Sequence, residues 1–147
     1  MIEYELETCK NQLEIIILKI NEKTILEIIK IKNPNGTIIE IMKLFFIITK
    51  VINDNEIPIW SFLQSKNIDY DILRKNLFEI QTKIINKETI DNCMNITFNY
   101  NDLKFSMSKI SKNLVTILDL LKTIVDYSIK KNMKESLQHT NINVIFI

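Results

Sequence analysis

The chain has one glycine, one histidine and two cysteines among 147 residues, and each scarcity excludes a class of function. Gly36 alone cannot supply a glycine-rich phosphate loop. His139 alone cannot build a multi-histidine metal site or a His-based triad. Cys9 and Cys93 are too few for a zinc site or a disulfide framework, which indicates a reducing compartment. We therefore expect no catalytic residue, no metal and no cofactor, and predict that the protein is not an enzyme.

Charge of one sign is also lacking. Nineteen basic and eighteen acidic residues leave a net charge of +1, and Arg74 is the only arginine, so a nucleic-acid partner is not expected. The apolar runs are far shorter than a membrane-spanning helix, and the acidic opening of the chain is unlike a signal peptide, so we expect no membrane partner. A hydrophobic fraction of 46% predicts one globular domain with a core.

The few helix breakers divide the chain. Asn33 and Pro34 form a predicted bend, because proline lacks a backbone donor and disfavours the α conformation in the residue before it. Before the bend, residues 1–32 predict one helix whose apolar stripe shifts phase near Ile20. The stripe fits a coiled-coil seam, or alternatively an amphipathic helix on a globular core. Its members are Leu6, Cys9, Leu13, Ile16 and Ile20.

After the bend, residues 33–113 predict a small helical head. We expect helices over 37–51, from Pro58 onward, over 69–80 with Asp69 as the N-cap, and over 86–94. Residues 97–102 should form a loop whose aromatic side chains pack into the core. A second long helix should run over about 102–139. The expected core anchors are Trp60, Phe98, Tyr100 and Leu114.

The predicted fold is all-α: a small helical bundle between two long helices that pair as an antiparallel coiled coil. Residues 1–32 would leave the pair, 114–139 would return to it, and 140–147 form a β-prone tail with no assigned role.

Local charge points to one candidate surface. Residues 30–50 carry four lysines and one glutamate (4 − 1 = +3), and residues 103–118 carry three lysines and no acid (+3). Residues 53–91 carry five basic and seven acidic residues (5 − 7 = −2). The basic stretches are either solvated helix faces or a docking surface for an acidic partner. The candidate binding residues are Lys32, Lys43, Lys104, Lys109 and Lys112.

The order of these features over residues 22–130 resembles the microtubule-binding domain and adjoining stalk coiled coil of dynein heavy chains. The matching elements are Leu26-Glu27-Ile28, Asn33-Pro34, Trp60, the helix from Tyr70 to Phe78, Phe98-Asn99-Tyr100, and the stretch from Ser108 to Leu114. The chain departs from the family where Asn35-Gly36 replaces a second proline and Ile117 replaces a tryptophan. Ile39, Ser106 and Thr116 also fall where the family carries basic residues.

The resemblance implies a stalk tip that binds tubulin in the microtubule, with an affinity set by the register of the coiled coil. The partners would be the microtubule and the rest of a dynein heavy chain, which would contain the ATPase. The implied location is the cytoplasm and its cytoskeleton, including the ciliary axoneme.

A different class of protein also fits the sequence. A non-catalytic helical interaction module would assemble through its long helices and would not prefer tubulin. That hypothesis predicts oligomerisation through Leu6, Leu13 and Ile20.

Overall fold

The computed structural model describes residues 1–53, 60–65, 67–83 and 85–145, and within them the fold is all-α. This part contains eight α-helices, one short 3₁₀ helix and no strand, which confirms the predicted class. Pro58 lies outside the described residues. The elements are α1 (Ile2–Lys19), α2 (Glu22–Ile29), α3 (Gly36–Ile48), α4 (Trp60–Ser65), α5 (Tyr70–Phe78), η1 (Glu79–Gln81), α6 (Lys87–Thr97), α7 (Tyr100–Ser108) and α8 (Lys112–Ile145).

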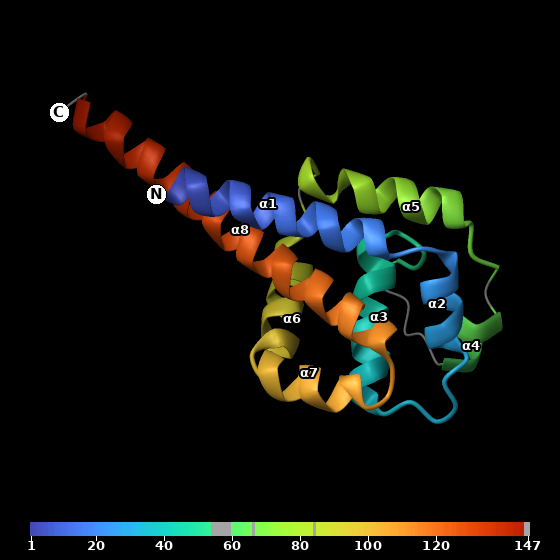
Figure 1. Cartoon of the computed structure of the whole chain (residues 1–147). Helices are drawn as coiled ribbons and strands as arrows, with labels where there is room; N and C mark the ends of the chain where they lie inside the picture. Colours follow the sequence, from blue (N-terminus) through green and yellow to red (C-terminus); the bar gives the residue numbers. More distant parts are fainter. Residues whose placement is uncertain (54–59, 66, 84, 146–147) are drawn as a thin grey trace.

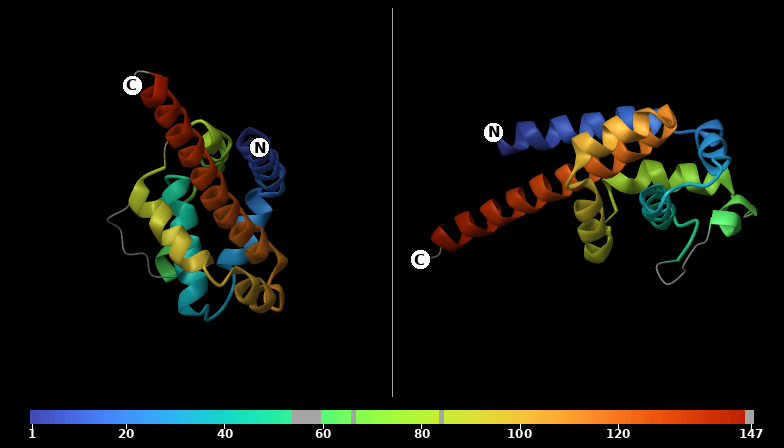
Figure 2. Two further views of the ribbon diagram at one scale, coloured as in Figure 1. Left: turned by 90° about the vertical axis from the view of Figure 1, so that its left-hand side faces the viewer. Right: turned by 90° about the horizontal axis from the view of Figure 1, so that it is seen from below.

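Helices α1 and α8 lie side by side and run in opposite directions, and α8 continues past the N-terminus of α1 (Figure 1). Ion pairs join Glu5 to Lys130 at 3.1 Å and Glu3 to Lys134 at 3.6 Å. The two axes separate toward these ends (Figure 2, right). Apolar contact is therefore concentrated in the second half of α1.

The apolar stripe of α1 is offset from the predicted seam. Leu13 and Ile20 are buried as expected, whereas Leu6 and Ile16 are only half-buried. Ile17, which the predicted seam omits, is 1% exposed. The buried residues of α1 are Cys9, Leu13 and Ile17, which are spaced by four residues. A straight helix repeats every 3.6 residues, so residues four apart lie on the same face, and this face of α1 packs against α8.

The prediction of one helix over residues 1–32 is wrong, because the chain breaks between α1 and α2. Ile20 is extended, and Asn21 starts α2 with a capping box in which its side chain accepts from the Thr24 N–H at 3.0 Å. The Thr24 hydroxyl oxygen accepts from the Asn21 N–H at 3.2 Å. The break falls at the predicted phase shift, so the shift marks a change of helix direction.

The second long helix is also divided, and the predicted loop before it is mostly helical. Helix α7 begins at Tyr100 and ends at Ser108, and the Met107 carbonyl accepts from the Ile110 and Ser111 N–H groups at 2.9 Å each. Helix α8 then runs from Lys112 to Ile145, so most of the predicted β-prone tail is helical. The helical state wins there because it continues a long helix that is already formed.

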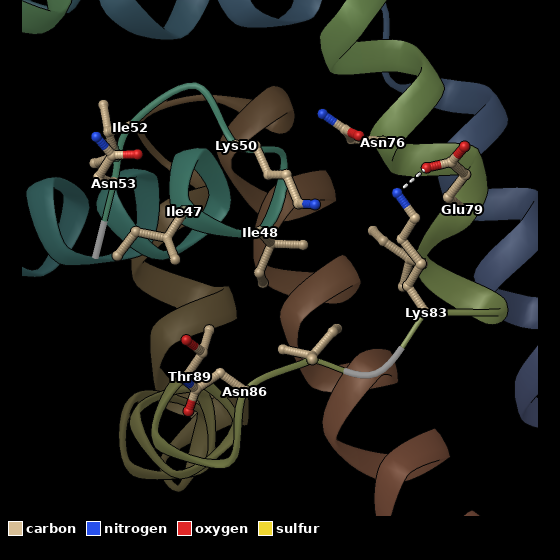
Figure 3. A pocket seen from close by; sticks show the side chains of 12 residues that line it. Ile47, Ile48, Lys50, Ile52, Asn53, Asn76, Glu79, Lys83, Asn86 and Thr89 are labelled. Carbon is tan, nitrogen blue, oxygen red and sulfur yellow. Dashed lines mark ion pairs between the residues drawn. The ribbon is translucent and has the colours of Figure 1, made fainter.

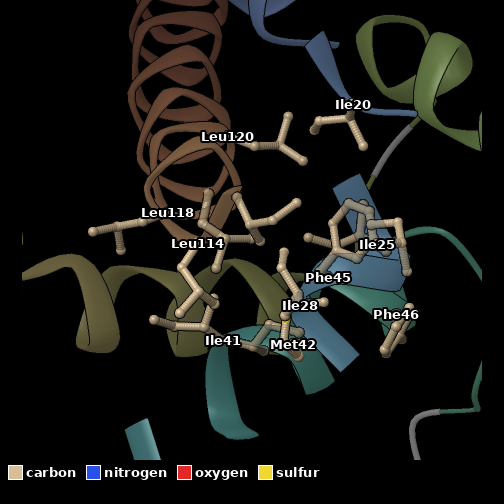
Figure 4. Close-up of a cluster of buried hydrophobic side chains, with 14 of the residues drawn as sticks. Ile20, Ile25, Ile28, Ile41, Met42, Phe45, Phe46, Leu114, Leu118 and Leu120 are labelled. Carbon is tan, nitrogen blue, oxygen red and sulfur yellow. The ribbon is translucent and has the colours of Figure 1, made fainter. Parts of the chain in front are cut away.

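The core is centred on α3, whose Phe45 and Phe46 rings are both fully buried and meet edge to face at 5.5 Å (Figure 4). Helices α6 and α8 pack against α3. Leu114 is 0% exposed and is the core anchor that the sequence predicts. Phe98 is 86% exposed, so its prediction as a core anchor is wrong. Phe98 lies in the turn between α6 and α7, and its side chain points to solvent there.

Candidate functional site

The predicted bend is present and has a defined backbone. Asn33 has φ = 52°, a left-handed conformation that asparagine tolerates better than most residues. Pro34 follows, and the Asn35 side chain accepts from the Ile38 N–H at 2.9 Å as the N-cap of α3. Asn33 and Pro34 therefore favour the turn after α2, and Asn35 favours the start of α3, which leads back into the core.

Two side chains of α4 hold the segment before the bend. The last carbonyls of a helix have no partner within it. The Trp60 Nε1–H donates to the Ile31 carbonyl at 2.9 Å, and Gln64 Nε2 donates to the Ile29 carbonyl at 2.8 Å. Trp60 is half-buried and packs on the core, so it anchors both the core and the bend.

The start of α8 is tied to α2 beside the bend. The Ser111 hydroxyl accepts from the Asn113 N–H at 3.1 Å, and the Asn113 side-chain amide donates to the Glu27 carboxylate. These bonds hold the α7–α8 turn next to the end of α2. Two basic stretches that are 80 residues apart therefore meet at one end of the molecule, away from both termini (Figure 1).

We call this surface the lysine tip and define it as Lys30, Lys32, Lys109 and Lys112. All four lysines are exposed, and none forms an ion pair with a described residue. The ammonium of Lys109 lies 4.2 Å from the centroid of the Phe105 ring, which is 65% exposed. The tip therefore combines unpaired positive charge with one exposed aromatic face.

Two of the predicted lysines do not join the tip. The Lys104 ammonium donates to the Tyr100 hydroxyl at 3.1 Å and lies 3.8 Å from the Asp119 carboxylate. Burial, and then the hydrogen bond to Asp119, raise the pKa of Tyr100. Lys43 is half-buried on α3, away from the N-terminus of that helix. Tyr100 is thus half-buried and holds α7 on α8 through Asp119.

The sequence interpretation missed several side chains that connect distant segments. Arg74 Nη1 donates to the Ile20 carbonyl at 3.1 Å and so caps the break between α1 and α2. Asn76 Nδ2 donates to the Thr49 carbonyl at 2.8 Å, at the end of α3. No local pattern identifies these partners, because they lie 54 and 27 residues away.

A separate cavity of about 520 Å³ lies between the end of α3, η1 and the start of α6 (Figure 3). Its lining combines isoleucine side chains with the polar side chains of Lys50, Asn76, Glu79 and Lys83. Glu79 forms an ion pair with Lys83, and this hydrogen bond holds the pKa of Glu79 below its usual value. No sequence motif predicted this cavity.

Both cysteine thiols are buried. Burial raises the pKa of Cys93 to about 12, so its thiol stays protonated near neutral pH. Burial also raises the pKa of Cys9. The described residues contain no group of three or more His, Cys, Asp or Glu side chains arranged to hold a metal ion.

Over the same residues, no helix combines the length and apolar character that crossing a bilayer requires. No protein-family model matches the chain, and neither a curated protein nor a solved structure shows significant similarity to it.

Proposed function

We propose that the chain is a microtubule-binding stalk tip of the dynein type, with the lysine tip as its tubulin-facing surface. The observation that supports this proposal is the position of the lysine tip relative to the two ends of the chain. The N-terminus and α8's C-terminal end lie on the same side, and the lysine tip lies at the opposite end (Figure 1). A domain carried on two stalk helices must present its binding surface away from them.

The chemistry of the tip supports an acidic partner. Residues 27–36 and 103–113 contain five lysines and one acid, Glu27, whose carboxylate accepts from Asn113. The four lysines of the tip form no ion pair with a described residue. The resemblance to dynein microtubule-binding domains implies that this partner is the acidic surface of tubulin. Complementary charges of this kind accelerate association and lose strength as salt rises, because the Debye length falls to about 8 Å at physiological ionic strength.

The stalk belongs to the same proposal. Helices α1 and α8 would extend into an antiparallel coiled coil, in which a change of register alters the tip. A path for such coupling runs from α1 through the capped break at Ile20 to α2, and from Glu27 to Asn113 at the start of α8. Movement of α1 along α8 would therefore pull on both halves of the lysine tip.

Co-sedimentation with polymerised microtubules tests the proposal. The Lys109→Glu, Lys112→Glu double variant should bind about tenfold more weakly or worse at low salt, because it reverses two tip charges. The matched control is Lys10→Glu, Lys19→Glu, which makes the same charge change on α1. Equal affinity of the two double variants, with helicity unchanged, contradicts the assignment of the tip. The chain with its native lysines should also be fused, through α1 and α8, to a coiled coil in each alternative register. If none of these fusions pellets with microtubules, the proposed microtubule-binding function is contradicted.

A second candidate is a helical interaction module, and one observation favours it. Ile129, Met133 and Leu137 lie at four-residue spacing along α8 and are 40%, 46% and 50% exposed. They form an apolar stripe that could pack against a partner helix. The seam first expected for this function is not available, because α8 of the same chain already covers Leu13 and Ile20.

Sedimentation velocity over a range of concentrations separates the two candidates. Self-association that Met133→Lys abolishes, together with no pelleting on microtubules, favours the module.

A further inference from the structure

The cavity between α3, η1 and α6 has one apolar side and one cationic side. Its apolar walls are isoleucine side chains from three segments, of which Ile48, Ile52 and Ile80 are largely buried. Ile47 and Ile85 complete the apolar lining. A volume of about 520 Å³ lies within the range of small-molecule sites in proteins.

The polar side carries an uncompensated positive charge. Lys50 and Lys83 line the cavity with one carboxylate, Glu79, so the charge at the site is 2 − 1 = +1. Glu79 pairs with Lys83, and Lys50 forms no ion pair with a described residue. Figure 3 shows the Lys83 ammonium paired with Glu79 and the Lys50 side chain on the opposite wall, at the end of α3. An anion placed between them would pair with the Lys50 ammonium and share the Lys83 ammonium with Glu79.

The backbone at Lys50 indicates that this side chain has a role. Lys50 has φ = 61° directly after α3, a position where glycine is normally found because it has no Cβ. A lysine there is strained relative to glycine, because its Cβ crowds the neighbouring carbonyl. Backbone strain of this kind clusters at functional sites, and here it places an exposed lysine at the edge of a cavity.

We propose that this cavity binds a linear aliphatic carboxylate, with the carboxylate between Lys50 and Lys83 and the alkyl chain along the isoleucine walls. The amphipathic shape of the cavity selects the ligand class. A purely polar anion would leave the apolar walls in contact with water, and a neutral hydrocarbon would forgo the attraction of the exposed Lys50 ammonium. This site is separate from the lysine tip and does not depend on microtubule binding.

Isothermal titration of the full chain with decanoate, and with decanol as the matched neutral chain, tests the proposal. We expect one saturable site for decanoate and at least about tenfold weaker binding of decanol, because only the carboxylate pairs with the lysines. Lys50→Asn should weaken decanoate about tenfold, since asparagine tolerates the backbone but lacks the charge. Lys50→Arg should retain binding, and Lys109→Asn, at the lysine tip, should leave it unchanged.

Methyl NMR of isoleucine-labelled protein locates the ligand. Decanoate should shift Ile47, Ile52 and Ile80 and leave Ile25 and Ile28 unchanged, because the latter two lie in the core beneath α8. The spectra also show that each variant is folded. Equal affinity for decanoate and decanol, undiminished binding by Lys50→Asn, shifts outside the cavity, or no binding at millimolar decanoate would each overturn the proposal.

Discussion

Replacing Lys50 by glycine should stabilise the protein, although it removes a whole side chain. The end of α3 is a Schellman motif: the Lys50 N–H donates to the Ile47 carbonyl at 3.1 Å and the Val51 N–H to the Phe46 carbonyl at 2.8 Å. Lys50 occupies its left-handed position with φ = 61°. A residue with a Cβ pays about 1–2 kcal/mol there, while glycine adds about 0.4–1 kcal/mol of entropy to the unfolded chain.

The difference predicts a gain of about 1 kcal/mol for Lys50→Gly, or about 2–4 °C in Tm for a domain of this size. Urea unfolding followed by far-UV circular dichroism measures it, with Lys50→Ala as the control. Alanine removes the same charge but keeps the Cβ, so it should give no gain. An unchanged or lower midpoint for Lys50→Gly, or the same gain for Lys50→Ala, would refute the conformational reasoning.

Two further predictions concern local stability and pH. Asn21→Ala removes the side-chain cap of α2 and should cost about 1 kcal/mol in the free energy of unfolding, whereas Asn11→Ala on the exposed face of α1 should cost almost nothing. Burial raises the pKa of Cys93 from 9.0 to about 12, so its contribution to stability is complete below pH 9 and is lost as the pH rises toward 12. Urea midpoints between pH 8 and 11 should therefore fall more steeply for the unmodified chain than for Cys93→Ala, and parallel curves would contradict the assignment.

Local chemistry predicted much of the helical framework. Asp69 is the N-cap of α5, where its carboxylate accepts from the Asp71 and Ile72 N–H groups at 3.1 and 3.2 Å. The helix predicted over 37–51 is α3, and the one over 86–94 is α6 with three further residues. These predictions were confirmed because caps and apolar periodicity act over a few residues.

The errors arose where packing decides between two locally acceptable outcomes. A stripe that shifts phase at Ile20 permits either a continuous helix or a break, and Arg74, which is distant in sequence, stabilises the break. The aromatic character of Phe98 predicts a core position, but the α6–α7 junction leaves this side chain exposed. Lys104 stays a predicted binding residue, and the structure places it beside Tyr100 and 3.8 Å from Asp119 rather than in the lysine tip.

The amino-acid sequence by itself determined the all-α class, the bend at Asn33 and Pro34, and the burial of Leu114, because helix periodicity, proline geometry and hydrophobicity are properties of neighbouring residues. Only the tertiary structure decided which lysines share a surface. Lys30 and Lys32 lie at the same end as Lys109 and Lys112, where α2 packs against α8 and Glu27 accepts from Asn113. The tertiary structure also formed the cavity around Lys50 from segments that are separate in the chain. Both sites depend on contacts between distant residues, which no local pattern encodes.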